Sequence, residues 1–173
     1  PTIEATGSNP AVTITGDFDV TIDGVDMDAA DNTDAVLKSS GGTATKTLTV
    51  SNASITMNTP DSTAEAYAIT DGFSAGGPKS NYVVDNVSVT SPQSDTEAAG
   101  VVLKDPGNSV TIRNSSFDSL DFGVQIAKDT NGSGVTIDNS TFSNLQDQGV
   151  ILNTDGDSGD SFGTINIQSN TFD

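Results

Sequence analysis

Apolar and polar residues alternate in short segments that recur along the chain. The segments "VTIRN" at 110–114 and "VTIDN" at 135–139 place an apolar side chain at every second position, and each ends on an asparagine. Three residues beyond each asparagine comes a phenylalanine, Phe117 or Phe142. Alternation with a period of two is typical of β-strands that bury one face. We therefore predict a strand before each asparagine, a turn at it, and a second strand around the phenylalanine.

The same register recurs six times. The anchor positions that align with the asparagines lie 25 to 34 residues apart: Gly24, Asn52, Asn86, Asn114, Asn139 and Ser169. Three residues beyond each anchor is an apolar residue: Met27, Ile55, Val89, Phe117, Phe142 and Phe172. A third apolar segment follows, clearest in "GVVL" at 100–103, "GVQI" at 123–126 and "GVIL" at 149–152. A repeat length in this range indicates a repeat architecture.

Stacked copies, spaced by about 4.8 Å, would place equivalent side chains in interior columns. Every member of four such columns is apolar. The four are Val20, Leu48, Tyr82, Val110, Val135 and Ile165; Ile22, Val50, Val84, Ile112, Ile137 and Ile167; the series from Met27 to Phe172; and Leu37, Ile69, Leu103, Ile126 and Leu152. The sequence thus predicts an all-β solenoid of about five to six coils with three short strands per coil.

This pattern resembles the right-handed parallel β-helix repeat proteins of the pectate-lyase-like superfamily, and the resemblance implies a right-handed, single-stranded parallel β-helix. The resemblance covers nearly all of residues 11–173 and implies the fold much more specifically than any function. We expect a single β-helix domain over 1–173, in which residues 1–10 form a lead-in or cap and residues 11–173 form the repeat coils.

The anchor asparagines are expected to form a structural ladder. Asparagine tolerates the left-handed conformation of a tight bend, and we expect the amides of Asn52, Asn86, Asn114 and Asn139 to turn inward and bond to one another. All four also begin glycosylation sequons, but a buried ladder position would make them inaccessible. The sequon at Asn131 lies in a predicted loop and is the one that we expect to be accessible.

Charge and composition exclude several classes of function. The net charge of −18, with six basic residues in 173, argues against binding to nucleic acid or to anionic membranes. No apolar stretch approaches the roughly 18 residues of a membrane span. The chain has no cysteine and no histidine, which excludes disulfides, zinc–thiolate sites and Ser–His catalysis. The acidic surface favours an extracellular or cell-surface location with high salt or calcium.

Two acidic clusters are candidate calcium sites. The first includes Asp26, Asp28 and Asp31, and the second includes Asp155, Asp157 and Asp160. In the second cluster, alternating oxygen ligands and a glycine-containing turn suit calcium, although the cluster lacks the spacing of an EF-hand. A solvated acidic turn is the alternative interpretation. Calcium is therefore the expected cofactor if there is one.

Catalysis is not expected. The resemblance implies that a polysaccharide lyase of this fold would need a basic residue beside acidic calcium ligands, and Arg113 is the sole arginine. Its position in the repeat should place it between Asp85 and Asp138 on adjacent coils, which is explained by a surface charge ladder.

The two ends of the predicted helix suggest self-association. The chain closes on "INIQSNTFD", which is a first and a second strand, while "AVTITG" near the start resembles a third strand. We expect a non-catalytic, extracellular structural protein that joins head to tail into a filament or surface layer. Ile165, Ile167 and Phe172 would form one assembly face, and Val12 and Ile14 the other. The alternatives are a carbohydrate-binding or polysaccharide-degrading module, with a polysaccharide as partner, and an excised segment of a longer adhesin-like solenoid.

Overall fold

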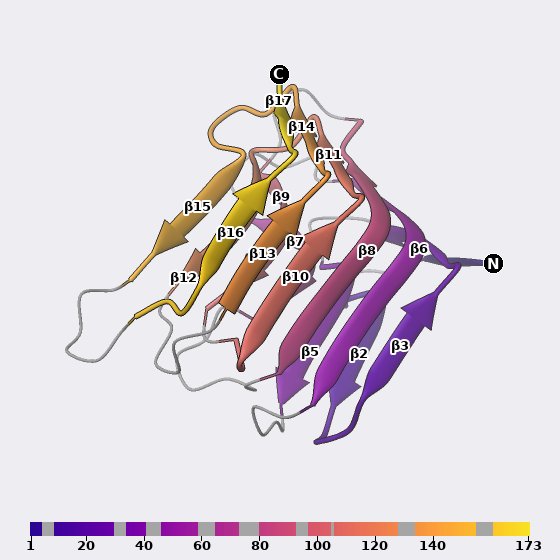
Figure 1. Cartoon of the computed structure of the whole chain (residues 1–173). Helices are drawn as coiled ribbons and strands as arrows, with labels where there is room; N and C mark the ends of the chain where they lie inside the picture. The colour runs from indigo at the N-terminus through magenta and orange to yellow at the C-terminus, as the bar shows by residue number, and fades with distance from the viewer. Residues whose placement is uncertain are drawn as a thin grey trace.

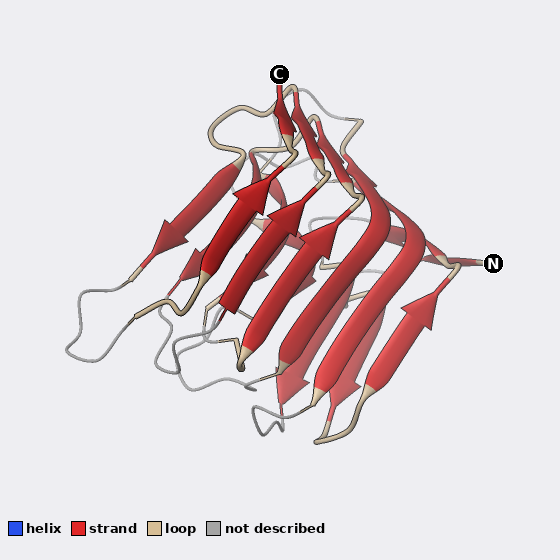
Figure 2. Ribbon diagram, viewed as in Figure 1, coloured by secondary structure: helices blue, strands red, loops and turns tan. Residues whose placement is uncertain are grey.

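The chain winds as a parallel β-solenoid. The computed structural model describes residues 1–4, 9–29, 34–40, 46–58, 65–72, 80–92, 97–104, 106–127, 134–154 and 161–173. Within these ranges every paired strand runs parallel to its neighbour and no helix is present, as Figures 1 and 2 show. The predicted all-β, β-helical fold is confirmed.

Each coil contains three strand positions, as expected. The first strands are β3 (Val20–Asp23), β6 (Thr47–Met57), β8 (Asn81–Thr90), β10 (Ser109–Arg113), β13 (Gly134–Asp138) and β16 (Ile165–Gln168). The second strands are β1 (Thr2–Glu4), β4 (Asp26–Ala29), β11 (Ser116–Asp118), β14 (Thr141–Ser143) and β17 (Thr171–Phe172), while β6 and β8 are long enough to serve as both. The third strands are β2 (Val12–Thr15), β5 (Val36–Ser40), β7 (Ala66–Thr70), β9 (Ala98–Leu103), β12 (Phe122–Ala127) and β15 (Val150–Asn153).

First and second strands form one sheet, and third strands form another. Among the described residues, β6, β8, β10 and β13 each lie between two other first strands, which corresponds to about four stacked turns, slightly fewer than the five to six expected. The third-strand sheet follows the order β15-β12-β9-β7-β5-β2. In Figure 1, β3 and β16 lie at opposite ends of the stack.

The interior columns of the first and second strands agree with the prediction. Val110 lies in register between Tyr82 and Val135, and Phe117 lies between Val89 and Phe142. All six side chains are at most 1% exposed. Burial of each such side chain contributes about 1.5–3 kcal/mol, which makes these columns the main source of stability.

The predicted third-strand column was wrong in its first two members. Ile69 pairs with Val101, not with Leu103, and Leu37 pairs with Thr70. A shift of two residues keeps the same face of a strand inward, and strand β9 is apolar and buried at every position, so the pattern did not distinguish the two registers. The observed columns are Val36, Ile69, Val101, Val124 and Val150, and separately Leu103, Ile126 and Leu152.

Glycines in the third strands make room for a stack of phenylalanine rings. The rings of Phe117 and Phe142 are 5.1 Å apart at 10°, and those of Phe142 and Phe172 are 4.9 Å apart at 7°. A Cβ on Gly123 would lie 2.5 Å from the Phe142 ring and 2.6 Å from the backbone oxygen of Gly149. The repeated "GV" in the sequence is therefore a packing requirement, because no larger residue fits beside the ring.

Candidate functional site

The anchor asparagines turn the corner between first and second strands in the left-handed conformation. The φ angles of Asn52, Asn86, Asn114 and Asn139 are 49°, 55°, 53° and 48°. Asparagine enters this region at low cost because its short amide can bond locally. The residue type at the anchor therefore explains the bend.

The amides of these asparagines form two separate hydrogen-bonded runs. Asn52 Nδ2 donates to Asp23 Oδ1 at 2.7 Å, and Asn86 Nδ2 donates to Asn52 Oδ1 at 2.8 Å. The second run starts afresh on the next coil, where Asn114 Nδ2 donates to Asp85 Oδ1 at 2.8 Å. Asn139 Nδ2 then donates to Asn114 Oδ1 at 2.8 Å. Each run thus begins at an aspartate of the preceding coil.

The expected inward orientation of Asn52, Asn86, Asn114 and Asn139 is wrong, because all four side chains are exposed. The left-handed bend points the asparagine outward and the next residue inward. Ser115 and Ser140, which follow the anchors, are only 4% and 2% exposed. Burial therefore no longer argues against glycosylation of the four anchors, although their Nδ2 atoms are engaged in hydrogen bonds. Asn131 lies outside the described residues.

An inner serine ladder, which sequence reasoning missed, satisfies the buried backbone at this corner. Ser115 Oγ accepts from Val87 N at 3.2 Å and donates to Arg113 O at 2.8 Å. Ser140 Oγ accepts from Ser115 N at 3.2 Å and donates to Asp138 O at 3.0 Å. The signal in the sequence was the serine that directly follows two of the anchor asparagines.

A shallow polar groove of about 320 Å³ runs along the outside of this corner. Amides of Asn52 and Asn86 and hydroxyls of Ser54 and Ser88 line it, with Asp26 at one end. Asp23, near that end, accepts from Ser51 and Asn52, and these bonds lower the pKa of its carboxyl. The groove can therefore exchange hydrogen bonds with a polar ligand.

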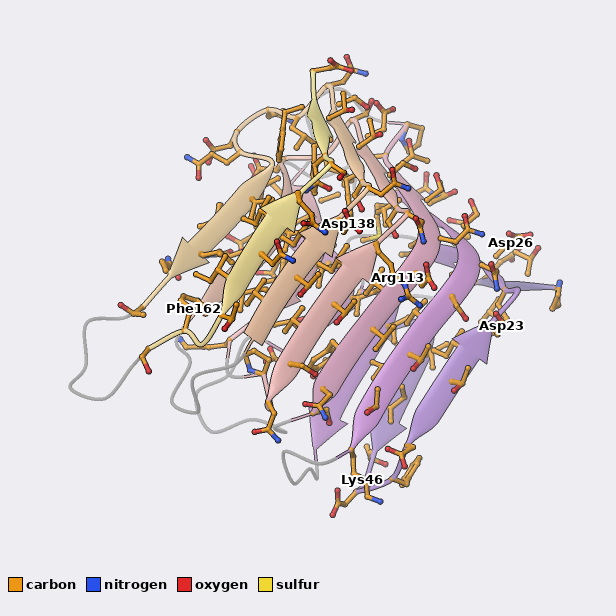
Figure 3. All side chains as sticks on the ribbon, viewed as in Figure 1. Asp23, Asp26, Lys46, Arg113, Asp138 and Phe162 are labelled. Carbon is orange, nitrogen blue, oxygen red and sulfur yellow. The ribbon has the colours of Figure 1, made fainter. Side chains whose placement is uncertain are left out.

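Arg113 pairs with one aspartate on the outer face. Its guanidinium donates to Asp85 at 2.8 Å, and the hydrogen bonds from Arg113 and Asn114 lower the pKa of Asp85. Asp138 flanks Arg113 on the neighbouring strand, as the labelled side chains in Figure 3 show. Because half of the Arg113 side chain is exposed, solvent screens the pair and it contributes little to stability. The geometry is that of a surface charge ladder.

A second aspartate-capped corner lies at the end of the second strands. Asp118 Oδ1 accepts from Ser143 Oγ at 2.7 Å and from Asn144 Nδ2 at 2.8 Å, and both bonds lower its pKa. Ser119 and Asn144 both have left-handed backbones, with φ of 57° and 52°. Each follows a column phenylalanine by two residues, which is a spacing that sequence reasoning did not use.

The candidate calcium ligands are only partly described. Asp26 and Asp28 lie on β4, and Asp28 Oδ1 accepts from Asn58 Nδ2 at 2.5 Å. Asp31, Asp155, Asp157 and Asp160 lie outside the described residues. In the described part of the chain, no three acidic side chains are grouped so that they could hold a metal ion. Calcium therefore stays a prediction.

The apolar columns reach the surface at one end of the solenoid, which we name the tail face. Ile165, Ile167 and Phe172 are 46%, 43% and 54% exposed. In the preceding coil, the equivalent residues are at most 1% exposed: Val135, Ile137 and Phe142. Among the described strands, β15, β16 and β17 each pair on one side only. The tail face thus combines unpaired strand edges with exposed interior columns.

The opposite end, the head face, is better covered. Val12 and Ile14 lie on edge strand β2, where Val12 is half-buried and Ile14 is 6% exposed. Strand β3 forms the first-strand edge, and β1 pairs along β4 with Ile3 beside Met27. Residues 1–10, which were expected to form a lead-in or cap, thus include β1, which pairs in register with a second strand of the solenoid.

Comparisons with known proteins give no match. No protein-family model matches this chain, and the searches of curated proteins and of solved structures found no match to it. The described residues include no helix long and apolar enough to cross a lipid bilayer. The family resemblance drawn from the sequence therefore extends to the β-solenoid fold alone.

Proposed function

We propose that this protein is a non-catalytic structural protein whose copies join head to tail into a filament or layer. The observation that carries the proposal is the tail face, where Ile165, Ile167 and Phe172 are about half exposed at column positions that are buried one coil earlier. An apolar column that ends at the surface next to unpaired strand edges favours addition of another coil.

The strand directions are compatible with this joint. Every described pair in both sheets is parallel, so β3 of one copy can follow β16 of another in the same direction. Likewise, β2 can follow β15 in the third-strand sheet. Because the two surfaces differ, the contact is heterologous and propagates without closing. That geometry produces a linear polymer.

Magnitudes indicate that strand pairing must contribute most of the binding energy. Burying the exposed half of Ile165, Ile167 and Phe172 contributes about 1 kcal/mol per side chain. Association itself costs about 4–15 kcal/mol. The difference has to come from edge hydrogen bonds, each of which contributes about 0.5–1.5 kcal/mol. We therefore expect assembly only at high protein concentration or on a surface that concentrates the protein, such as a cell surface.

Charged substitutions on the tail face test the proposal. Ile167→Asp and Phe172→Asp should leave a folded monomer that no longer polymerises, because each places a carboxylate at the end of an apolar column. Asn166→Asp is the matched control, since Asn166 lies on the same edge strand between two column positions and points outward. Sedimentation velocity and negative-stain microscopy measure the polymer, and circular dichroism measures the fold. A parent chain that stays monomeric at high concentration, with and without calcium, contradicts the proposal.

A further inference from the structure

The first and the last strand of the chain, β1 and β17, are both second strands. In chain order, the head begins with β1, β2 and β3, which are a second, a third and a first strand. The tail ends with β15, β16 and β17, which are a third, a first and a second strand. The next strand after β17 in a continuous solenoid would be a third strand. The chain of a following copy begins instead with β1, which is a second strand.

Strand β1 therefore occupies the position on β4 that β17 of a preceding copy would take if the two copies joined as one continuous solenoid. If β2 of the following copy pairs with β15 and its β3 pairs with β16, then its β4 must pair with β17. The edge of β4 that would face β17 is already covered by β1. If β1 instead stays and pairs with β17, the following β2 and β3 lie one strand spacing, about 4.8 Å, too far away to pair.

We propose that β1 is a displaceable plug on the head face, and that β17 of the preceding copy replaces it on β4 when two copies join. This inference rests on the proposed head-to-tail assembly and adds its regulation. The partner is a second copy of the chain, and the surface that it fits is the β2, β3 and β4 edge after β1 has left.

The contacts of β1 are suited to displacement. Strand β1 has three residues, and its one inward side chain, Ile3, is only partly buried against the core. The rest of the interaction between β1 and β4 consists mostly of backbone hydrogen bonds, including the one that Asp26 N donates to Pro1 O at 3.0 Å.

The incoming strand matches the position that β1 leaves. Phe172 on β17 belongs to the same column as Ile3, which lies in register with Met27. Phe172 is 54% exposed at the tail, so the exchange buries an aromatic ring in place of a smaller side chain. The exchange also allows β2 to pair with β15 and β3 with β16, which a joint that retains both β1 and β17 does not achieve. Displacement is therefore coupled to assembly.

A reversible lock on β1 tests this inference. The chain has no cysteine, so Thr2→Cys combined with Asp26→Cys introduces one defined pair. The two positions are in register on adjacent strands and both side chains are exposed, which suits a disulfide. We expect the oxidised variant to stay monomeric and the reduced variant to polymerise like the parent chain. The two single-cysteine variants, kept reduced, control for the substitutions.

Deletion of residues 1–4 is the complementary variant. If the head is open in fewer than a tenth of the molecules, removal of β1 lowers the critical concentration by about tenfold or more. Light scattering measures the critical concentration, and circular dichroism verifies the fold. If the deletion variant does not fold, the disulfide pair decides alone.

The outcomes separate the two proposals. If oxidised and reduced variants polymerise equally, assembly stands and the role of β1 is wrong. If the parent chain, the reduced variant and the deletion variant all remain monomeric, head-to-tail assembly itself is wrong. Polymers from the reduced variant but not from the oxidised variant support both.

Discussion

At the scale of the residue, the anchor asparagines act mainly through backbone conformation. Asn114 has a φ of 53° and makes two side-chain hydrogen bonds on an exposed surface, to Asp85 and from Asn139. Exposed hydrogen bonds contribute modestly because water replaces them when they break. The left-handed bend is the larger requirement, since most side chains enter that region at a cost of about 1–2 kcal/mol.

Substitutions of Asn114 separate these two contributions. Asn114→Ala should lower the free energy of unfolding by about 1–3 kcal/mol, because it removes both hydrogen bonds and strains the bend. Asn114→Gly removes the same bonds but tolerates the bend, so its loss should be smaller. Urea denaturation followed by circular dichroism measures both. A loss for glycine that equals or exceeds the loss for alanine would show that backbone conformation does not control this position.

At the scale of the element, side-chain size determines how closely the two sheets approach. Gly123 on β12 lies against the Phe142 ring of the second-strand column and against the backbone oxygen of Gly149. Backbone oxygen cannot move aside as the end of a flexible side chain can. The close approach of third and second strands therefore depends on the absence of a side chain at this position.

Gly123→Ala is expected to destabilise the solenoid strongly. The added Cβ would lie within 2.6 Å of a backbone oxygen, and overpacking of this kind costs about 1–3 kcal/mol or more. Gly134→Ala is the matched control, because the nearest atom to its added Cβ is 3.8 Å away. Melting temperatures measure the difference. Equal melting temperatures for the two variants would contradict the packing described here.

At the scale of the whole molecule, charge opposes both folding and association. The net charge is −18, and the pKa of Asp121 is raised first by burial and then by the neighbouring carboxylates of Glu97, Asp147 and Glu65. Repulsion among like charges is long-ranged at low salt and is screened beyond about 10 Å at 0.1 M. Two copies that meet head to tail experience the same repulsion.

Salt should therefore promote assembly. Sodium chloride is expected to raise the melting temperature and lower the critical concentration for polymer formation, because it screens carboxylate repulsion. Thermal denaturation and light scattering over a salt series measure both. Calcium at the same ionic strength should stabilise further, reversibly with a chelator, if the acidic clusters bind it. An equal effect of the two salts would assign the whole response to screening and exclude the calcium site. Assembly that weakens as salt rises would contradict the role of repulsion.

The sequence by itself determined the repeat, the three strand positions of each coil and the interior columns of the first and second strands. These features depend on local chemistry: alternation predicts which side of a strand is buried, and asparagine tolerates the left-handed bend. The aligned positions Val110 and Phe117 therefore took their predicted partners in the structure.

Only the tertiary structure decided the orientation of the asparagines, the break between Asn86 and Asn114, the pairing of Ile69 with Val101, and the position of β1 on β4. Each depends on contacts between segments distant in the chain, joined by connections of unequal length. Strand β9 is apolar and buried at every position, so its pattern does not distinguish registers two residues apart, and the three residues of β1 are too few to show a period. Residue type sets the local conformation, but it does not determine which edges meet, because the stacking of whole coils selects those partners.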